Sequence, residues 1–193
     1  MQHAHQAWLT AFTICSLCAP APSYGDTLVP NTVQFENSIK DDAYGKVCEY
    51  VLLILNLPAP ETVNFHVQVM RPMSNGKLID PTLVGFSMDV GELRFSGGMP
   101  AGGRKVNLAT AAFSSLTFSS AGRLNIAPFG DGGISGSTTD RSTGNEFMNA
   151  FLKGGYDLSF TREDWPGIRS YHLSSSPLME VVKSFHACLR TLL

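Results

Sequence analysis

The sequence predicts an α+β fold: an antiparallel β-sandwich or curled sheet with two helices in the C-terminal third. Val63, Phe65, Val67 and Val69 alternate with polar residues, which is typical of a half-buried antiparallel strand. Helical spacing appears only late, in the segments 146–153 and 178–192. The 193 residues fit one domain in size, and we expect a single α+β domain over residues 26–193.

The first half of this domain is predicted to be strands. The apolar run Val47–Leu57 predicts a central strand covered on both faces, linked to the next strand as a hairpin. Further strands are expected at the ranges 33–39 (a short edge strand), 84–90 (continuing to 95 after a bulge near Gly91) and 123–129. Turns are expected at 72–81 and 97–103, and the segment Val106–Phe118 fits either a strand or a short helix.

The last third is predicted to be helix, hairpin and helix. Asn145 is the expected N-cap and Gly154 the stop of the first helix. Two strands follow, joined by a turn at Asp164–Gly167, and Ser176 with Pro177 begins the last helix. That helix carries one apolar stripe at positions 178, 181, 182, 185, 188, 189 and 192.

The N-terminus predicts export. Residues 1–25 are interpreted as a signal peptide, because Ala7–Ala19 has the length of an apolar signal core and small residues at 23 and 25 allow cleavage before Asp26. The chain would then contact a membrane only through this segment, and it would be periplasmic or secreted. A retained apolar helix is the alternative. In such an oxidising compartment Cys48 and Cys188 predict a disulfide, with two unpaired cysteines as the alternative.

The charge pattern argues against several classes of function. Charged residues make up 16% of the chain and the formal net charge is −2, with no basic cluster, so we expect no nucleic-acid partner. The glycine-rich segment 98–105 lacks the residues of a phosphate loop, and segment 131–136 lacks those of a calcium loop. The scattered histidines predict no metal site and no cofactor.

A candidate binding surface remains. The polar, glycine-rich segment Gly130–Gly144 is predicted to be a long loop, which is usually functional or mobile, and it offers Asp131 and Ser135. Trp165 and Tyr171 are aromatic candidates for contact with a partner, although packing would also explain them. A hydrolytic site pairing Ser135 or Ser137 with His172 is an alternative, but no sequence signature identifies a nucleophile, and we expect no catalytic residue.

The C-terminal segment resembles a known family. The runs 147–152 and 156–160, Tyr171-His172-Leu173-Ser174, and the final stretch from Pro177 to Cys188 resemble the closing segment of small proteobacterial periplasmic proteins of the invasion-associated locus B type. The resemblance covers about a quarter of the chain. It implies a β-sandwich with a final amphipathic helix, and a role in the envelope or in host interaction without catalysis.

The sequence therefore favours a non-enzymatic exported envelope-accessory or binding protein of a Gram-negative bacterium, whose partner is an unknown protein or envelope component. Two alternatives remain open: a small secreted hydrolase, and an inhibitor or immunity protein for a secreted toxin.

Overall fold

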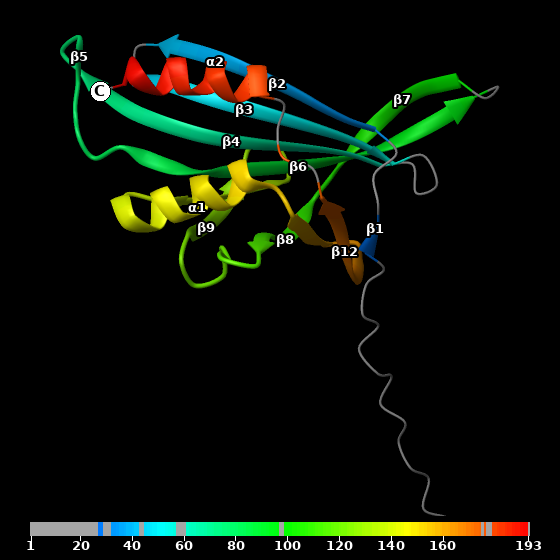
Figure 1. The fold of residues 1–193 in the computed structure, drawn as a ribbon. Helices are drawn as coiled ribbons and strands as arrows, with labels where there is room; N and C mark the ends of the chain where they lie inside the picture. The colour runs from blue at the N-terminus through cyan, green and yellow to red at the C-terminus, as the bar shows by residue number, and fades with distance from the viewer. Residues whose placement is uncertain are drawn as a thin grey trace, which may run out of the picture.

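In a computed structural model of the chain, residues 27–28, 32–42, 45–56, 61–96, 99–174, 176 and 179–192 can be described. The predicted signal peptide and Pro177, the predicted first residue of the last helix, lie outside these residues. The α+β prediction is confirmed: two antiparallel-rich sheets and two helices pack together (Figure 1).

The larger sheet, which we call the long sheet, has the strand order β2-β3-β4-β6-β10-β9, with β5 paired to β4 and β7 to β6. The bounds of its strands are β2 Thr32–Asp42, β3 Gly45–Asn56, β4 Glu61–Ser74, β5 Lys77–Leu78, β6 Leu83–Ser96, β7 Met99–Val106, β9 Asn125–Phe129 and β10 Gly133–Thr138.

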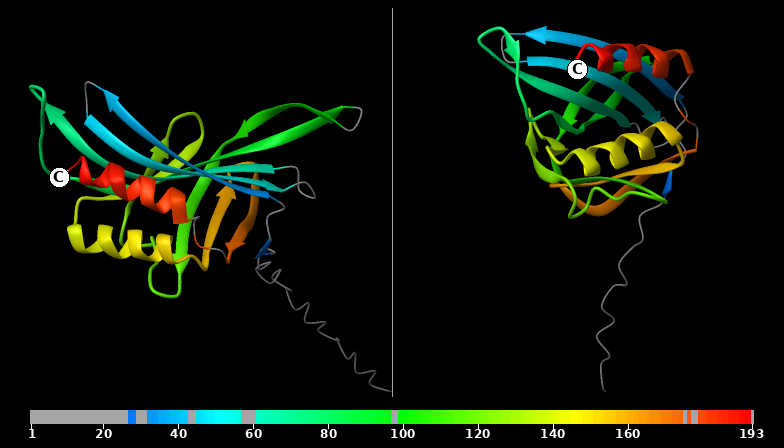
Figure 2. Two further views of the ribbon diagram at one scale, coloured as in Figure 1. Left: turned by 45° about the horizontal axis from the view of Figure 1, so that its top comes forward. Right: turned by 60° about the vertical axis from the view of Figure 1, so that its left-hand side comes forward.

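The smaller sheet, which we call the short sheet, has the order β1-β12-β11-β8. Its strands are β1 Thr27–Leu28, β8 Leu108–Ser115, β11 Tyr156–Arg162 and β12 Trp165–Leu173. The segment Val106–Phe118, which fitted either a strand or a short helix, therefore contains a strand, β8. The helices are α1 Arg141–Lys153 and α2 Met179–Arg190. Figure 2 shows both helices and the short sheet on the same side of the curled long sheet.

The core lies between this inner face of the long sheet and the elements that pack on it. The predicted alternation of β4 is confirmed, since its four odd-numbered apolar side chains from Val63 to Val69 are buried. At the centre, Phe113 of the short sheet packs against Phe65 of the long sheet and against Phe147 of α1, with ring centroids 6.2 and 5.1 Å apart. Aromatic packing therefore joins all three layers.

Helix α2 closes one end of the core. Its predicted stripe is confirmed at Phe185, Cys188 and Leu192, which are buried. The Cys188 and Cys48 sulfurs lie at disulfide-bonding distance, with the two Cα atoms 5.8 Å apart, as the sequence predicted. Phe185 also packs edge-on against Tyr50, with ring centroids 6.0 Å apart, so the helix covers the β3 end of the sheet.

The main correction to the predicted fold concerns two glycine-rich segments that were expected to be loops but contain strands and the start of a helix. Segment 130–144 contains β10 and the start of α1, and segment 97–103 contains the start of β7. A Cβ at Gly133 would lie 2.8 Å from Met88 O and 2.9 Å from Phe129 O, so glycine there permits close strand pairing. Helix α1 begins earlier than expected because Asp140 caps it, accepting a 2.7 Å hydrogen bond from Thr143 N.

Three smaller predictions are also corrected. The β4–β6 register runs straight through Gly91, and the irregularity lies at Arg94/Phe95 in the pairing with β7. The last hairpin turns at residues 163–164, because Trp165 already pairs with Arg162. Strand β3 is interior to the sheet as predicted, but its fully buried apolar side chains, Cys48, Tyr50, Leu52 and Ile54, all lie on the inner face. Its outer face is half-buried apart from the buried Glu49.

Candidate functional site

The sequence-predicted surface residues fall in two different places. Trp165 and Tyr171 lie on β12 of the short sheet, whereas Asp131 and Ser135 lie at the β9–β10 turn and on β10 of the long sheet. Tyr171 is fully buried, so it is a core residue and does not offer a contact surface. Trp165 is 40% exposed, and its ring lies where a Cβ on Gly167 would be, beside the Arg169 guanidinium at 5.0 Å.

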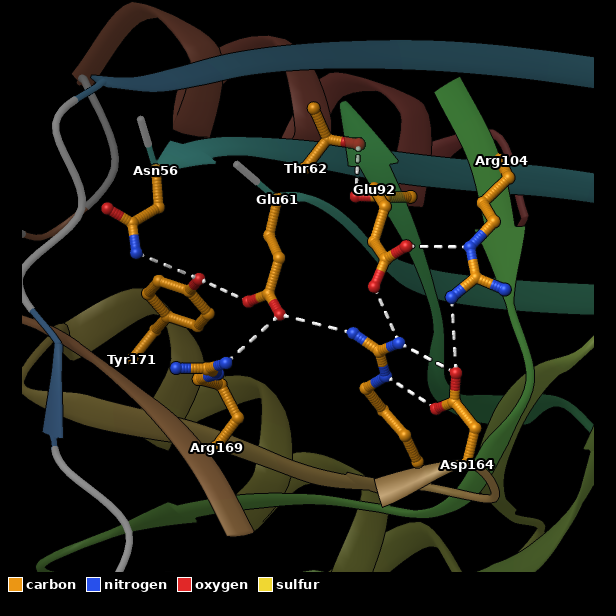
Figure 3. Close-up of polar contacts among 10 residues, drawn as sticks. Asn56, Glu61, Thr62, Glu92, Arg104, Asp164, Arg169 and Tyr171 are labelled. Carbon is orange, nitrogen blue, oxygen red and sulfur yellow. Dashed lines mark hydrogen bonds and ion pairs between the residues drawn. The ribbon is translucent and has the colours of Figure 1, made fainter. Parts of the chain in front are cut away.

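Charged side chains gather where the two sheets meet, in a set that we call the ion cluster (Figure 3). The long sheet contributes Glu61, Glu92 and Arg104, while β11, its following turn and β12 contribute Arg162, Asp164 and Arg169. Three carboxylates thus face three guanidinium groups. Sequence spacing does not predict this grouping, which arises because the short sheet packs on the long sheet.

Glu61 is the most buried member of the ion cluster, with its side chain 4% exposed. It accepts a 2.9 Å hydrogen bond from Tyr171 Oη and lies 3.4 Å from an Arg169 nitrogen and 3.7 Å from an Arg162 nitrogen. Asn56 donates to the same Tyr171 oxygen over 3.3 Å. Burial raises the pKa of Tyr171, so its hydroxyl stays protonated and donates to the carboxylate.

Arg162 links the outer part of the cluster. Its guanidinium lies 2.6 Å from Glu92 Oε1 and binds both oxygens of Asp164 at 2.8 Å. Arg104 makes a second bridge between the same two carboxylates, at 2.6 Å to Glu92 and 3.2 Å to Asp164. Each carboxylate is therefore held by two arginines. This arrangement fixes the base of the β6–β7 hairpin to the short sheet.

The electrostatics of the cluster predict acid sensitivity. The Arg162 hydrogen bond lowers the pKa of Asp164 to about 2, and the Arg104 hydrogen bond lowers that of Glu92. Both folded pKa values lie below the unfolded ones, so the stabilisation is present above the unfolded values and is lost as pH falls through the folded ones. We expect the free energy of unfolding to fall on acidification from about pH 4.5 to about pH 2.

Urea denaturation at a series of pH values measures this dependence. Asp164→Asn and Glu92→Gln should each flatten the curve in the acid window, and about 0.5 M salt should flatten it in the wild type because it screens exposed charge. An acid limb of unchanged slope in both variants would contradict the assignment.

The outer face of the long sheet is the second polar region. Its register places Val51, His66, Ser87 and Ser135 side by side on β3, β4, β6 and β10. His66 Nδ1 lies 2.8 Å from Glu49 Oε1, which also accepts a 2.7 Å hydrogen bond from Gln68. Both helices and the short sheet contact the inner face of the long sheet instead, through aromatic rings and the Cys48–Cys188 pair.

The predicted hydrolytic arrangement is not assembled. Ser135 and Ser137 lie on the long sheet, whereas His172 lies on the short sheet, where its Nδ1 is 2.8 Å from Asp157. Ser87 is opposite His66 in the β4–β6 register but is only 2% exposed, so a substrate cannot reach it without rearrangement. The Glu49–His66 pair is therefore best explained as a cross-strand contact that fixes these side chains on the sheet.

Sequence reasoning missed both regions. A sequence signal that could have revealed the ion cluster is a charged residue at an inward position, since Glu61 continues the buried face of Val63 and Arg162 continues that of Phe160.

No group of three or more His, Cys, Asp or Glu residues suited to a metal ion occurs in the described part of the chain. No helix there is long and apolar enough to cross a membrane. No family model, curated protein or solved structure matches the chain.

Proposed function

We propose that the chain is an exported, non-enzymatic binding or accessory protein of a Gram-negative envelope, and that its partner binds on the outer face of the long sheet. The observation that carries this proposal is that the two faces of the long sheet differ in polarity and burial. The inner face holds the apolar core, whereas the outer face keeps half-exposed polar and apolar side chains in register. A face of mixed polar and apolar character is typical of non-obligate interfaces.

Export is the second part of the proposal. It is supported by the apolar run Ala7–Ala19 with small residues before Asp26, by the resemblance of the C-terminal segment to periplasmic proteins, and by the pairing of Cys48 with Cys188. The full chain, expressed in a Gram-negative host, should be recovered from the periplasm with its N-terminus near Asp26. Recovery of intact chain in the cytoplasm would contradict export.

Binding is tested with two surface variants that carry the same new charge. Purified mature protein should be retained by washed bacterial envelopes, and Leu53→Lys on the outer face of the long sheet should reduce the retained fraction several-fold, because it places a charge in the proposed interface. The matched control is Ser159→Lys on the outer face of the short sheet, which should bind like the wild type. Equal retention of both variants, or none of the wild type, would contradict the proposal.

A further inference from the structure

The two ends of the long sheet differ in how their free edges are built. Strand β9 forms one end; it has five residues and contains Pro128, which cannot donate a backbone hydrogen bond and so limits pairing with a further strand. Strand β2 forms the other end. It has 11 residues without proline or glycine, and its register with β3 is unbroken from Thr32 to Asp42. The second edge of β2 is therefore long and regular, and no described strand pairs with it.

Helix α2 lies beside this edge and leaves it open. The helix packs over β2 and β3 on the inner face of the sheet (Figure 1), where Phe185 and Cys188 are buried. Leu189 flanks this buried stripe on one side and packs against the core, which lies toward the centre of the sheet. Ser184 and Ala187 flank the stripe on the opposite side, because successive residues are rotated by about 100° around a helix, and both are exposed. The helix therefore presents small, exposed side chains above the free edge of β2.

Antiparallel pairing of β2 with β2 of a second copy suits this geometry. A two-fold axis perpendicular to the sheet would continue the long sheet from one copy into the other and place both α2 helices on the same face. Neighbouring strands are about 4.8 Å apart and each helix lies over β2 and β3, so the two helix axes would be about 10 Å apart. Packed helices lie about 8–10 Å apart. The small side chains of Ser184 and Ala187 permit that approach.

Two charges on β2 select the register of this pairing. The register with β3 places Glu36, Ser38 and Lys40 on the outer face of the sheet, with Ser38 midway between the two charged positions. A two-fold axis through Ser38 puts Glu36 of each copy opposite Lys40 of the other, and opposite charges across an antiparallel pair are stabilising. An axis through Glu36 would instead put two like charges opposite each other. The charge pattern therefore favours the axis through Ser38.

We propose that the chain forms a two-fold symmetric homodimer through β2, with residues 34–42 of the two copies paired antiparallel about Ser38 and the two α2 helices in contact beside the axis. An extended peptide from another protein would also pair with a free edge. Such a peptide requires neither charges that complement themselves about one residue nor a small, exposed helix face beside the edge. The dimer does not rest on the proposed function; it would join the outer faces of two long sheets into one surface.

The test is the molar mass of the purified protein in solution, measured by light scattering and by sedimentation over a concentration series. The wild type should be a dimer at about 100 µM, and Glu36→Lys should weaken the dimer about tenfold because it puts lysines opposite each other. Glu36→Lys combined with Lys40→Glu should restore the wild-type affinity, because the two charges are exchanged and the pairs form again. A combined variant as weak as Glu36→Lys overturns the register about Ser38.

Helix α2 supplies a matched pair of variants. Ser184→Glu places a new carboxylate beside the axis in both copies and should weaken the dimer about tenfold. His186→Glu introduces the same charge at an exposed position on the other side of the helix, and it should dimerise like the wild type. Thermal unfolding checks that each variant is folded. The inference is overturned if the wild type is a monomer at that concentration, or if Ser184→Glu and His186→Glu dimerise alike.

Discussion

Reduction of the Cys48–Cys188 bond is expected to lower the free energy of unfolding by about 4 kcal/mol. The bond joins residues separated by 140 positions, and closing so long a loop removes much of the conformational entropy of the unfolded chain. It also holds α2 to β3 beside Phe185 and Tyr50, so the amphipathic helix should fray in the reduced protein. Urea denaturation with and without reductant measures the difference.

The control for this prediction is the double variant Cys48→Ala/Cys188→Ala. Its stability should be insensitive to reductant and close to that of the reduced wild type, since the two side chains are 0% and 3% exposed and alanine fits an apolar site. His186→Ala changes an exposed position of the same helix and should keep the full dependence on reductant. Equal stability of oxidised and reduced wild type would refute the bond's role.

The sequence predicted those parts of the fold in which a local pattern and burial agree. Alternation in Val63–Met70 identified β4, and helical spacing around Phe185 identified α2, because each element buries one face against a single core. The cysteine pairing followed from the expected compartment. In each case the information lies within a few neighbouring residues or in a simple count.

The prediction that the glycine-rich segments are loops was wrong for a physical reason. Glycine is both the residue of flexible loops and the residue that permits close backbone approach, and composition does not distinguish the two uses. At Gly133 the second use applies, since a Cβ there would lie 2.8 Å from Met88 O, and at Gly136 the absence of a side chain makes room for the Phe86 ring, 2.7 Å from where a Cβ would be. The segment 130–144 therefore contains a strand in the middle of the long sheet's β6–β10–β9 arrangement, where a loop was expected.

The candidate sites could not be predicted because they depend on register between distant strands. His66 and Ser135 share a row only through Ser87 on β6, and Glu61 meets Arg162 only when the short sheet packs on the long one. Ser135, a candidate binding residue in the sequence, lies half-buried on β10, and its neighbours on the outer face come from other strands.

Removal of the buried carboxylate by Glu61→Ala is expected to lower the free energy of unfolding by about 3 kcal/mol, because it leaves the Arg169 guanidinium without a carboxylate partner among the described residues and deprives the buried Tyr171 hydroxyl of its acceptor. Urea denaturation provides the measurement. Glu163→Ala, which removes an exposed carboxylate hydrogen-bonded to Asn107, should cost less than about 1 kcal/mol.

A second variant separates the cost of an unpaired charge from the worth of the ion pairs themselves. If the unpaired charge of Arg169 causes the loss, then Glu61→Met combined with Arg169→Met should recover much of the stability, since an apolar pair avoids the desolvation of both groups. That variant keeps the contacts of Arg162 with Glu92 and Asp164, so the β6–β7 hairpin should stay as resistant to proteolysis as it is in the wild type. A single variant Glu61→Ala as stable as wild type would show that the ion cluster does not hold the two sheets together.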